Sequence, residues 1–349
     1  MIDPLGGTVH AGSPFEVYLY QHRGLVLSEF GRVFSHAEKD PDLGRYLHVP
    51  DRDFTRRGGK MVRPVLCLLG AEAVGGDRRL AMSSAIAVER FQTAALIHDD
   101  IADEGQVRRG RPCMHLTEGV GVAINVGDGA LVEVVGGVLD DACLDDATKL
   151  RLVRELVQME RRTVEGQALD LGWTRDGRWD VTVDDYLRMA TLKTAHYSCA
   201  TPLVLGAICG GGTDEQAEAL RAFGLDAGLA FQLQDDLLNL VGSEDEQGKD
   251  LRSDITEGKR TLAAVWTLSH AEDGDRDELA GLLGSHTDDP DKLARAVDIM
   301  QGCGAIDHVR EEALRLSESA KDRLANVTLA DEAREVLESM ADFFVERLR

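Results

Sequence analysis

The scarcity of proline in the middle of the chain constrains the fold more than any other feature of the sequence. Of the 8 prolines, only Pro112 and Pro202 fall between residues 65 and 289. Because proline interrupts helices, this distribution favours long helices over many short strands. With 349 residues, 43% of them hydrophobic, the chain can bury a sizeable core. We therefore expect an all-α protein with a flexible lead over residues 1–15 and a single domain over residues 16–349.

Apolar residues at helical spacing predict the individual helices. They fall at residues 15–36, 65–74, 80–101, 119–139, 147–171, 182–195, 201–208 and 217–241, with further helices from residue 261 onward. Residues 172–179 are expected to form a turn-rich loop, and Thr182 and Thr201 are expected N-caps. The helix over 80–101 is apolar on nearly every face, so it should lie at the centre of the core.

This central helix ends in a cluster of carboxylates. Asp99, Asp100 and Asp103 stand at positions i, i+1 and i+4, which places Asp99 and Asp103 on one helical face. The C-terminus of a helix carries partial negative charge, so acids there are unfavourable unless a cation is supplied. The cluster therefore predicts a metal site.

The helix over 217–241 ends in a similar way. Asp235 and Asp236 are adjacent, and Asn239 follows three residues later. Carboxylate and amide oxygens suit a hard cation such as Mg²⁺. Downstream, a polar loop carries Lys249 and Lys259.

Cationic residues accompany both acidic groups. Arg108 and Arg109 follow the first. Lys60 and Arg63 would share a face if a helix starts in this stretch, and Pro64 fits a first helical turn. Taken alone, such cations are most often solvated side chains, and the same holds for a helix lysine such as Lys193. In a protein with a net charge of −23, a local basic cluster instead favours an anion cradle.

The overall charge also narrows the partners. So acidic a chain argues against nucleic acid or an anionic membrane as the main partner. The six cysteines show no CxxC spacing, so free thiols are expected. Residues 119–139 are mostly apolar, but Asp128 and Glu133 argue against a transmembrane segment there. With no signal peptide apparent, we expect a cytoplasmic protein.

Together, the motifs resemble those of the trans-isoprenyl diphosphate synthase (polyprenyl synthetase) family, geranylgeranyl diphosphate synthases included. The resemblance covers residues 58–261 and keeps the family's motif order. It rests on Gly59-Lys60-x-x-Arg63-Pro64, Gln92, Asp99-Asp100-x-x-Asp103, Arg108-Arg109-Gly110, Lys193-Thr194, Gln232 with Asp235-Asp236, Lys249 and Lys259.

The resemblance implies a fold and a set of roles. The fold would be a bundle of ten or more helices around a central apolar cavity (the isoprenoid synthase fold), usually a homodimer. Metal ligands would be Asp99, Asp103, Asp235 and Asn239, binding three Mg²⁺ ions, with Asp100 and Asp236 in support. The allylic diphosphate would be held by Arg108, Lys193, Thr194, Gln232, Lys249 and Lys259. Isopentenyl diphosphate would be held by Lys60, Arg63, Gln92 and Arg109.

The implied reaction is prenyl transfer. Mg²⁺ and the cations would stabilise the departing diphosphate, and the isopentenyl double bond would attack the resulting allylic cation. The expected catalytic residues are Asp99, Asp100, Asp103, Arg108, Lys193, Asp235 and Asp236. One residue departs from the family pattern: Asn239 stands where aspartate is commonest, which predicts weaker metal binding there and retained activity.

The sequence also bears on the length of the product and on two alternative functions. Ala94 and Ala95 lie one turn before Asp99, where short-chain members carry aromatic residues, so a product of twenty carbons or more is implied. A class I terpene cyclase would share the metal chemistry but would have no use for Lys60 and Arg63. A non-catalytic subunit of a heteromeric synthase should have lost an aspartate motif or its lysines.

Overall fold

The computed structural model describes residues 12–33, 40–242 and 251–346, so most of the expected lead lies outside the described residues. The α-helices are α1 (Pro14–Val33), α2 (Pro41–Leu43), α3 (Val49–Arg56), α4 (Val62–Ala73), α5 (Met82–Ala102), α6 (Met114–Thr117), α7 (Val120–Leu139), α8 (Asp146–Arg175), α9 (Val183–Ala190), α10 (Thr201–Cys209), α11 (Asp214–Val241), α13 (Ser253–Glu257), α14 (Leu262–His270), α15 (Asp273–Leu282), α16 (Pro290–Gly302), α17 (Ala305–Arg323) and α18 (Asp331–Glu346). Two π-helices, η2 (Gly44–His48) and η4 (Thr191–Ala200), and the 3₁₀-helix η3 (Arg78–Ala81) complete the helical set. Strands β1 (Val107–Arg108) and β2 (Arg111–Pro112) form a short antiparallel ladder. The all-α expectation is confirmed.

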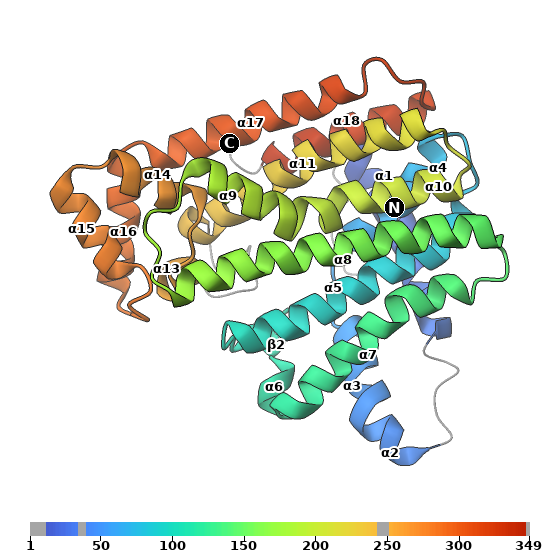
Figure 1. Cartoon of the computed structure of the whole chain (residues 1–349), viewed down its shortest axis with the longest axis horizontal. Coiled ribbons are helices and arrows are strands. Elements are labelled where there is room, and N and C mark those ends of the chain that lie inside the picture. The colour runs from blue at the N-terminus through green and yellow to red at the C-terminus, as the bar shows by residue number, and fades with distance from the viewer. Residues whose placement is uncertain (1–11, 34–39, 243–250, 347–349) are drawn as a thin grey trace.

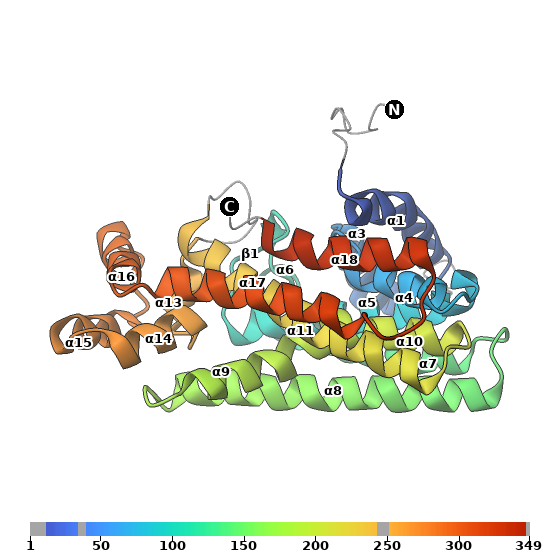
Figure 2. The ribbon, with the colours of Figure 1, turned by 90° about the horizontal axis from the view of Figure 1, so that it is seen from above.

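The long helices form a bundle (Figure 1). Seen from above, α8 lies along one side, α1 and α18 lie along the other, and α5, α10 and α11 run between them (Figure 2). Helix α5 packs against α7, α4 against α10, and α11 against both α17 and η4. Helices α14, α15 and α16 gather at one end of the bundle (Figure 1).

Helices α4 and α10 approach each other so closely that only glycine fits at the contact. A Cβ atom on Gly206 would lie 2.0 Å from the Cys67 carbonyl oxygen, and one on Gly70 would lie 2.2 Å from the Leu203 carbonyl oxygen. These distances are far below any van der Waals contact, so the two backbones rest directly on each other.

Two local expectations were wrong. Helix α8 continues through the expected loop at 172–179 as far as Arg175, because a single glycine such as Gly172 does not end a helix. Thr201 is not an N-cap, since η4 leads into α10 without a break and Ala200 keeps a helical backbone. Thr182 is confirmed as the N-cap of α9, where it forms a capping box with Asp185.

By length and composition, α7 is the one helix among the described residues that could cross a membrane. One third of its most apolar window is buried, and it packs against α5 and α8. A single helix of this kind is weak evidence for a membrane span.

Candidate active site

The first acidic group lies where α5 ends. Asp99 occupies the last turn, and Asp103 caps the helix, donating its N–H to the Asp99 carbonyl at 2.9 Å. Gln167 on α8 donates to Asp99 Oδ1 at 3.1 Å, and Lys259 donates to Asp103 Oδ2 at 3.0 Å. Burial and the neighbouring Asp99 raise the pKa of Asp103 despite the opposing effect of Lys259. The two carboxylates therefore interact, as their spacing predicted.

Asp100 points to the other side of the helix and holds Arg108. The guanidinium donates from Nε to Asp100 Oδ1 at 2.6 Å, and its Nη2 lies 2.5 Å from the same oxygen. Burial alone would lower the pKa of Arg108, but Asp100 more than offsets this and raises it. Asp100 therefore orients a permanently charged arginine at the edge of the site.

The second acidic group lies near the end of α11. Asp236 is half-buried and accepts hydrogen bonds from the Tyr186 hydroxyl at 2.6 Å and from Gln232 Nε2 at 2.7 Å. Burial and the nearby Asp254 raise the pKa of Asp236 to about 7, although both hydrogen bonds oppose the change. These donors fix the Asp236 carboxylate, while its neighbour Asp235 lines the cavity.

Asn239 is engaged with the start of α13. Its Nδ2 donates to Ser253 Oγ at 3.1 Å, and its Oδ1 accepts the Asp254 N–H at 3.2 Å. In this arrangement the amide connects the end of α11 to the helix that carries Asp254.

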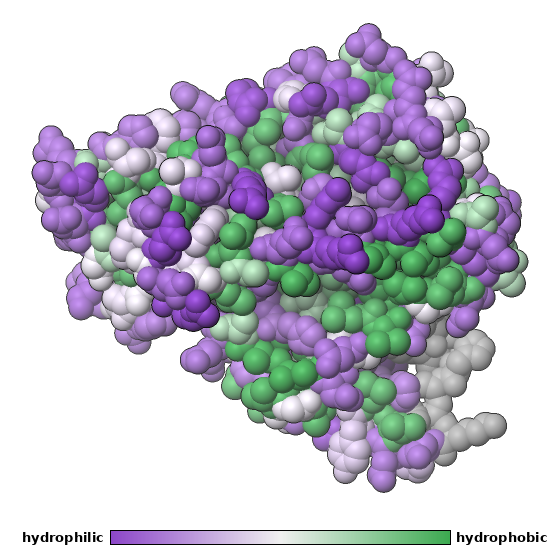
Figure 3. Space-filling model, in the orientation of Figure 1, coloured by the Kyte–Doolittle hydropathy of each residue, from purple (hydrophilic) through white to green (hydrophobic). Residues whose placement is uncertain are grey.

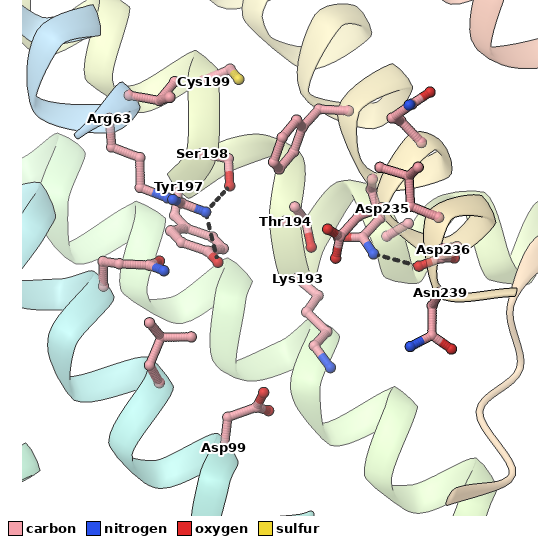
Figure 4. Close-up of a pocket in the computed structure, with 18 of the residues that line it drawn as sticks. Arg63, Asp99, Lys193, Thr194, Tyr197, Ser198, Cys199, Asp235, Asp236 and Asn239 are labelled. Atoms are coloured by element: carbon pink, nitrogen blue, oxygen red, sulfur yellow. Dashed lines mark hydrogen bonds between the residues drawn. The ribbon is translucent and has the colours of Figure 1, made fainter. Parts of the chain in front are cut away.

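Two half-buried lysines lie between the acidic groups. Lys193, on the π-helix η4, pairs with Asp170 of α8, and Lys259 pairs with Glu257 at 2.6 Å. For both lysines burial alone would lower the pKa, but the surrounding carboxylates outweigh it and raise the pKa above the usual value. Both ammonium groups therefore stay charged at neutral pH. Figure 4 shows Lys193 reaching into the space between Asp99 and Asn239.

A cationic cluster lies on the opposite side of the cavity, at the start of α4. Arg63 donates from Nη2 to the Tyr197 hydroxyl at 3.1 Å and to Ser198 Oγ at 2.8 Å (Figure 4). Its guanidinium also stacks over the Tyr197 ring at 4.5 Å. Arg109, from the β1–β2 turn, lies 3.9 Å from the buried Glu89 carboxylate. Lys60 and Gln92 line the cavity beside them.

The backbone around this cluster adopts an uncommon conformation. Met61 and Arg109 have φ angles of 56° and 55°, in the left-handed region that side chains other than glycine rarely adopt. Such residues cost of order 1–3 kcal/mol each and gather at functional sites. Gly110, at φ 71°, follows Arg109 and makes the tight turn possible.

One cavity of about 470 Å³ brings most of the predicted residues together. Its lining includes Lys60, Arg63, Gln92, Asp99, Arg108, Arg109, Lys193, Thr194, Gln232, Asp235, Asp236, Asn239 and Lys259. Asp100 and Asp103 lie behind it, bound to lining residues. Ala94 is fully buried and Ala95 packs into the main core, so neither lines it. Lys249 lies outside the described residues.

The structure adds four residues that the sequence did not assign to the site: Glu89, Gln167, Asp170 and Tyr186. Gln167 and Asp170 have the i, i+3 spacing of one helical face, which was a readable signal. Tyr186 gave no such signal, because its apolar neighbours made it a core position and its hydroxyl partner is 50 residues away.

The donor set suits magnesium bound jointly with a ligand. Among the described residues, no three His, Cys, Asp or Glu side chains gather closely enough to hold an ion by themselves. Magnesium usually takes only one or two carboxylates and completes its shell with water and phosphate oxygens. Two separated carboxylate groups facing one cavity fit this requirement, and the nearby lysines and arginines fit phosphate oxygens.

Comparisons with known proteins agree with this geometry. The family model described as polyprenyl synthetase matches residues 45–300. A short chain isoprenyl diphosphate synthase from Methanothermobacter thermautotrophicus is 40% identical over 290 residues, which span 83% of this chain and 87% of the relative.

Solved structures agree as well. Geranylgeranyl pyrophosphate synthetase from Pyrococcus horikoshii superposes with a TM-score of 0.86 at 32% identity, covering 95% of this chain and 98% of that one. Geranylgeranyl pyrophosphate synthase from Corynebacterium glutamicum, solved with isoprenyl diphosphate and magnesium, gives 0.86 at 28% identity, covering 95% and 99%. The fold is thus the all-α isoprenoid synthase fold, as the sequence resemblance implied. The chain therefore belongs to the polyprenyl synthetase family and is a prenyltransferase.

Proposed function

We propose that the chain condenses isopentenyl diphosphate with an allylic diphosphate and releases an all-trans polyprenyl diphosphate. The observation that carries the proposal is the division of the cavity into two anion-binding sides. One side combines the two acidic helix ends with Lys193 and Lys259, and the other combines Lys60, Arg63 and Arg109. A reaction between two diphosphates needs both sides.

The allylic diphosphate is assigned to the side of the two acidic groups. Asp99, Asp103 and Asp235, with Asn239, would hold magnesium, three ions by analogy with the family. When bound, magnesium would neutralise charge that develops on the departing diphosphate. Arg108, Lys193, Thr194, Gln232, Lys249 and Lys259 are assigned to the same diphosphate.

The protein's own groups then favour ionisation of the allylic substrate. Lys193 and Lys259 are charged and fixed by carboxylates before substrate arrives, so little reorganisation is needed as the leaving group gains charge. Asp100 and Asp236 act indirectly, Asp100 by orienting Arg108 and Asp236 through its bond from Gln232.

Isopentenyl diphosphate is assigned to Lys60, Arg63, Gln92 and Arg109. Its double bond would attack the allylic cation, and the released diphosphate would accept the proton lost from the adduct. The apolar lining, which includes Leu96, Met189 and Phe231, would keep water away from the cation.

We further propose a product of twenty carbons or more, because Ala94 and Ala95 present only methyl groups below the first acidic group. Neither residue lines the cavity, so a growing chain would have to displace the side chains that separate them from it. A large aromatic side chain at either position would instead occupy that space.

A homodimer is proposed from an apolar stripe on α7 and α8. The exposed apolar residues of α8 recur every seven residues or multiples of seven, and those of α7 extend the stripe. They are Leu150, Val164 and Leu171 on α8, and Val120, Ile124, Val132 and Leu139 on α7. Figure 3 shows hydrophobic side chains gathered over α7 and the adjoining part of α8. A patch of this kind is typical of a protein interface.

The test is to incubate the purified chain with Mg²⁺, isopentenyl diphosphate and an allylic primer, and then to size the products. Elongated diphosphates support the proposal. Hydrocarbons formed from a single allylic substrate would instead indicate a cyclase, and inactivity without a partner chain would indicate a regulatory subunit.

A further inference from the structure

A buried carboxylate lies inside the cationic side of the cavity. Glu89, on α5, is 4% exposed and lines the cavity close to Gln92. Its Oε1 lies 3.9 Å from Arg109 Nη2, and Arg63 acts on it electrostatically as well. An anion in a subsite assigned to an anionic substrate is unexpected, because it must repel that substrate whenever it is charged.

Two charged groups act on Glu89 directly: Arg63 on α4 and Arg109 on the β1–β2 turn. Further charges lie nearby, since Arg108 and Asp100 act on Arg109, Lys60 lines the same cavity, and Arg90 and Asp51 form a pair beginning at the residue after Glu89. Arg90 is bound to Asp51 at 2.7 Å, and Arg108 is bound to Asp100. Arg63 and Arg109 are therefore the cations whose charge Glu89 offsets. Their positive charges repel each other, and Arg63 lowers the pKa of Arg109.

Glu89 has a different electrostatic balance before and after a diphosphate binds. Before binding, burial raises its pKa while Arg63 and Arg109 lower it, and burial prevails. A bound diphosphate would neutralise both arginines and add negative charge nearby, and each effect disfavours the carboxylate further. A protonated Glu89 would also gain an O–H donor. Gln92 Oε1, one turn along α5, is buried with no hydrogen-bond partner in the described part of the chain.

Resting on the proposed assignment of this side to isopentenyl diphosphate, we propose that Glu89 is a positioning residue that changes protonation with the substrate. In the free enzyme its carboxylate balances Arg63 and Arg109. When isopentenyl diphosphate binds, Glu89 takes a proton from solvent, so the arginines are released to the diphosphate without a buried repulsive charge.

The sign of the pH dependence follows from this exchange. The bound state holds one more proton than the free state, so affinity falls as pH rises, by about tenfold per pH unit in the limit. Titration of the substrate's own terminal phosphate acts in the opposite direction, because its second ionisation near pH 6 adds charge that the arginines attract.

The experiment is calorimetric titration of isopentenyl diphosphate into the full chain between pH 7 and 8, in phosphate-free buffers of different ionisation heat. Metal is omitted, because the acidic side then repels the ligand and binding is confined to the arginines. We expect the wild type to take up protons as the ligand binds, and Glu89→Gln to lose this uptake and most of the pH dependence. Glu160→Gln is the matched control, since Glu160 is a partly buried carboxylate of α8 that does not line the cavity.

Infrared difference spectra of the wild type provide a readout that needs no variant. Binding should produce a protonated carboxyl band, and Glu89→Asp should retain it at a shifted frequency. The inference is overturned if the wild type takes up no proton, or if Glu89→Gln takes up as many as the wild type. The assignment of the subsite fails separately, if Arg63→Ala binds isopentenyl diphosphate as tightly as the wild type.

Discussion

Lys259 Nζ donates to Asp103 Oδ2 at 3.0 Å, and this bond joins residues that are 156 positions apart in the chain. Asp103 ends the first acidic helix, and Lys259 follows the second. The two halves of the acidic side are thus already connected by an ion pair before a substrate arrives. Lys259 also keeps other contacts, since it pairs with Glu257 and lies 3.9 Å from Asp254.

This pair makes Lys259 the first target for substitution. Lys259→Ala removes the cation between three carboxylates, so their mutual repulsion rises and the leaving diphosphate loses a partner. We expect kcat to fall about 100-fold or more, with a smaller loss for Lys259→Arg. Steady-state kinetics with the allylic substrate would measure this. Lys292→Ala, an exposed lysine of α16, should behave as the wild type, and an unchanged kcat in Lys259→Ala would contradict the role.

Substitution of the carboxylates that we assign to metal should affect turnover more than substitution of the Asn239 amide. Asp99→Ala and Asp235→Ala should abolish turnover, because each removes a charged oxygen ligand. Asn239→Asp should keep it, since the smaller change leaves an oxygen that can still accept the Asp254 N–H. Magnesium titrations of activity would compare all three, and full activity in Asp99→Ala would refute the assignment.

The apolar stripe on α7 and α8 predicts the oligomeric state. Val132 is 72% exposed and Val164 is 65% exposed, so a charge at either position costs little within one protomer. We expect Val132→Asp and Val164→Asp to convert dimers into monomers, as measured by light scattering across a dilution series. Val17→Asp, on the exposed face of α1, is the control. A wild type that is monomeric at all concentrations would contradict the prediction.

Product length should respond to bulk below the first acidic group. Ala95 packs against the main core next to the cavity, so a phenylalanine there should push neighbouring side chains into the path of the chain, and the main product should shorten by at least one isoprene unit. Ala325→Phe, at an exposed position after α17, should leave the product unchanged. Chromatography of the dephosphorylated products would show the difference, and an unshortened product in Ala95→Phe would argue against growth along α5.

Stability should depend on pH through His196. Burial, with Arg162 and Arg221 nearby, lowers the pKa of His196 to about 4. Between about pH 6.5 and 4 the unfolded chain therefore binds more protons here than the folded chain, so stability is lost as pH falls through this window. With solvent screening, the loss should be about 1–2 kcal/mol. Urea unfolding at pH 7 and 5 should show a smaller change in His196→Gln than in the wild type, whereas exposed His286→Gln should match the wild type.

Those parts of the fold that depend on local pattern were predictable. Helical spacing and the scarcity of proline predicted an all-α fold. The aspartates lie at the C-terminal ends of α5 and α11, as the sequence predicted. The π-helix η4 was not predictable, because Thr191–Ala200 contains neither glycine nor proline to mark a departure from an ordinary α-helix. The same holds for α8 beyond residue 171, where neighbouring packing outweighs local turn residues.

The site divides in the same way. The charged motifs could be recognised in the sequence, because paired acids and basic clusters are costly without a ligand. The residues that hydrogen-bond to these motifs could not be recognised in this way. Tyr186 and Gln167 reach their aspartates across 50 and 68 positions of sequence. Only the tertiary packing, of α9 beside α11 and of α8 beside the end of α5, brings each pair together.

The glycine contact between α4 and α10 bears on how such enzymes diversify. Helix α4 begins beside Arg63, and α10 continues directly from η4, which carries Lys193. Because main chain rests on main chain at Gly70 and Gly206, the span between the two reacting ends is independent of the side chains around it. Substitutions that reshape the space for the hydrocarbon tail can therefore accumulate without disturbing bond formation.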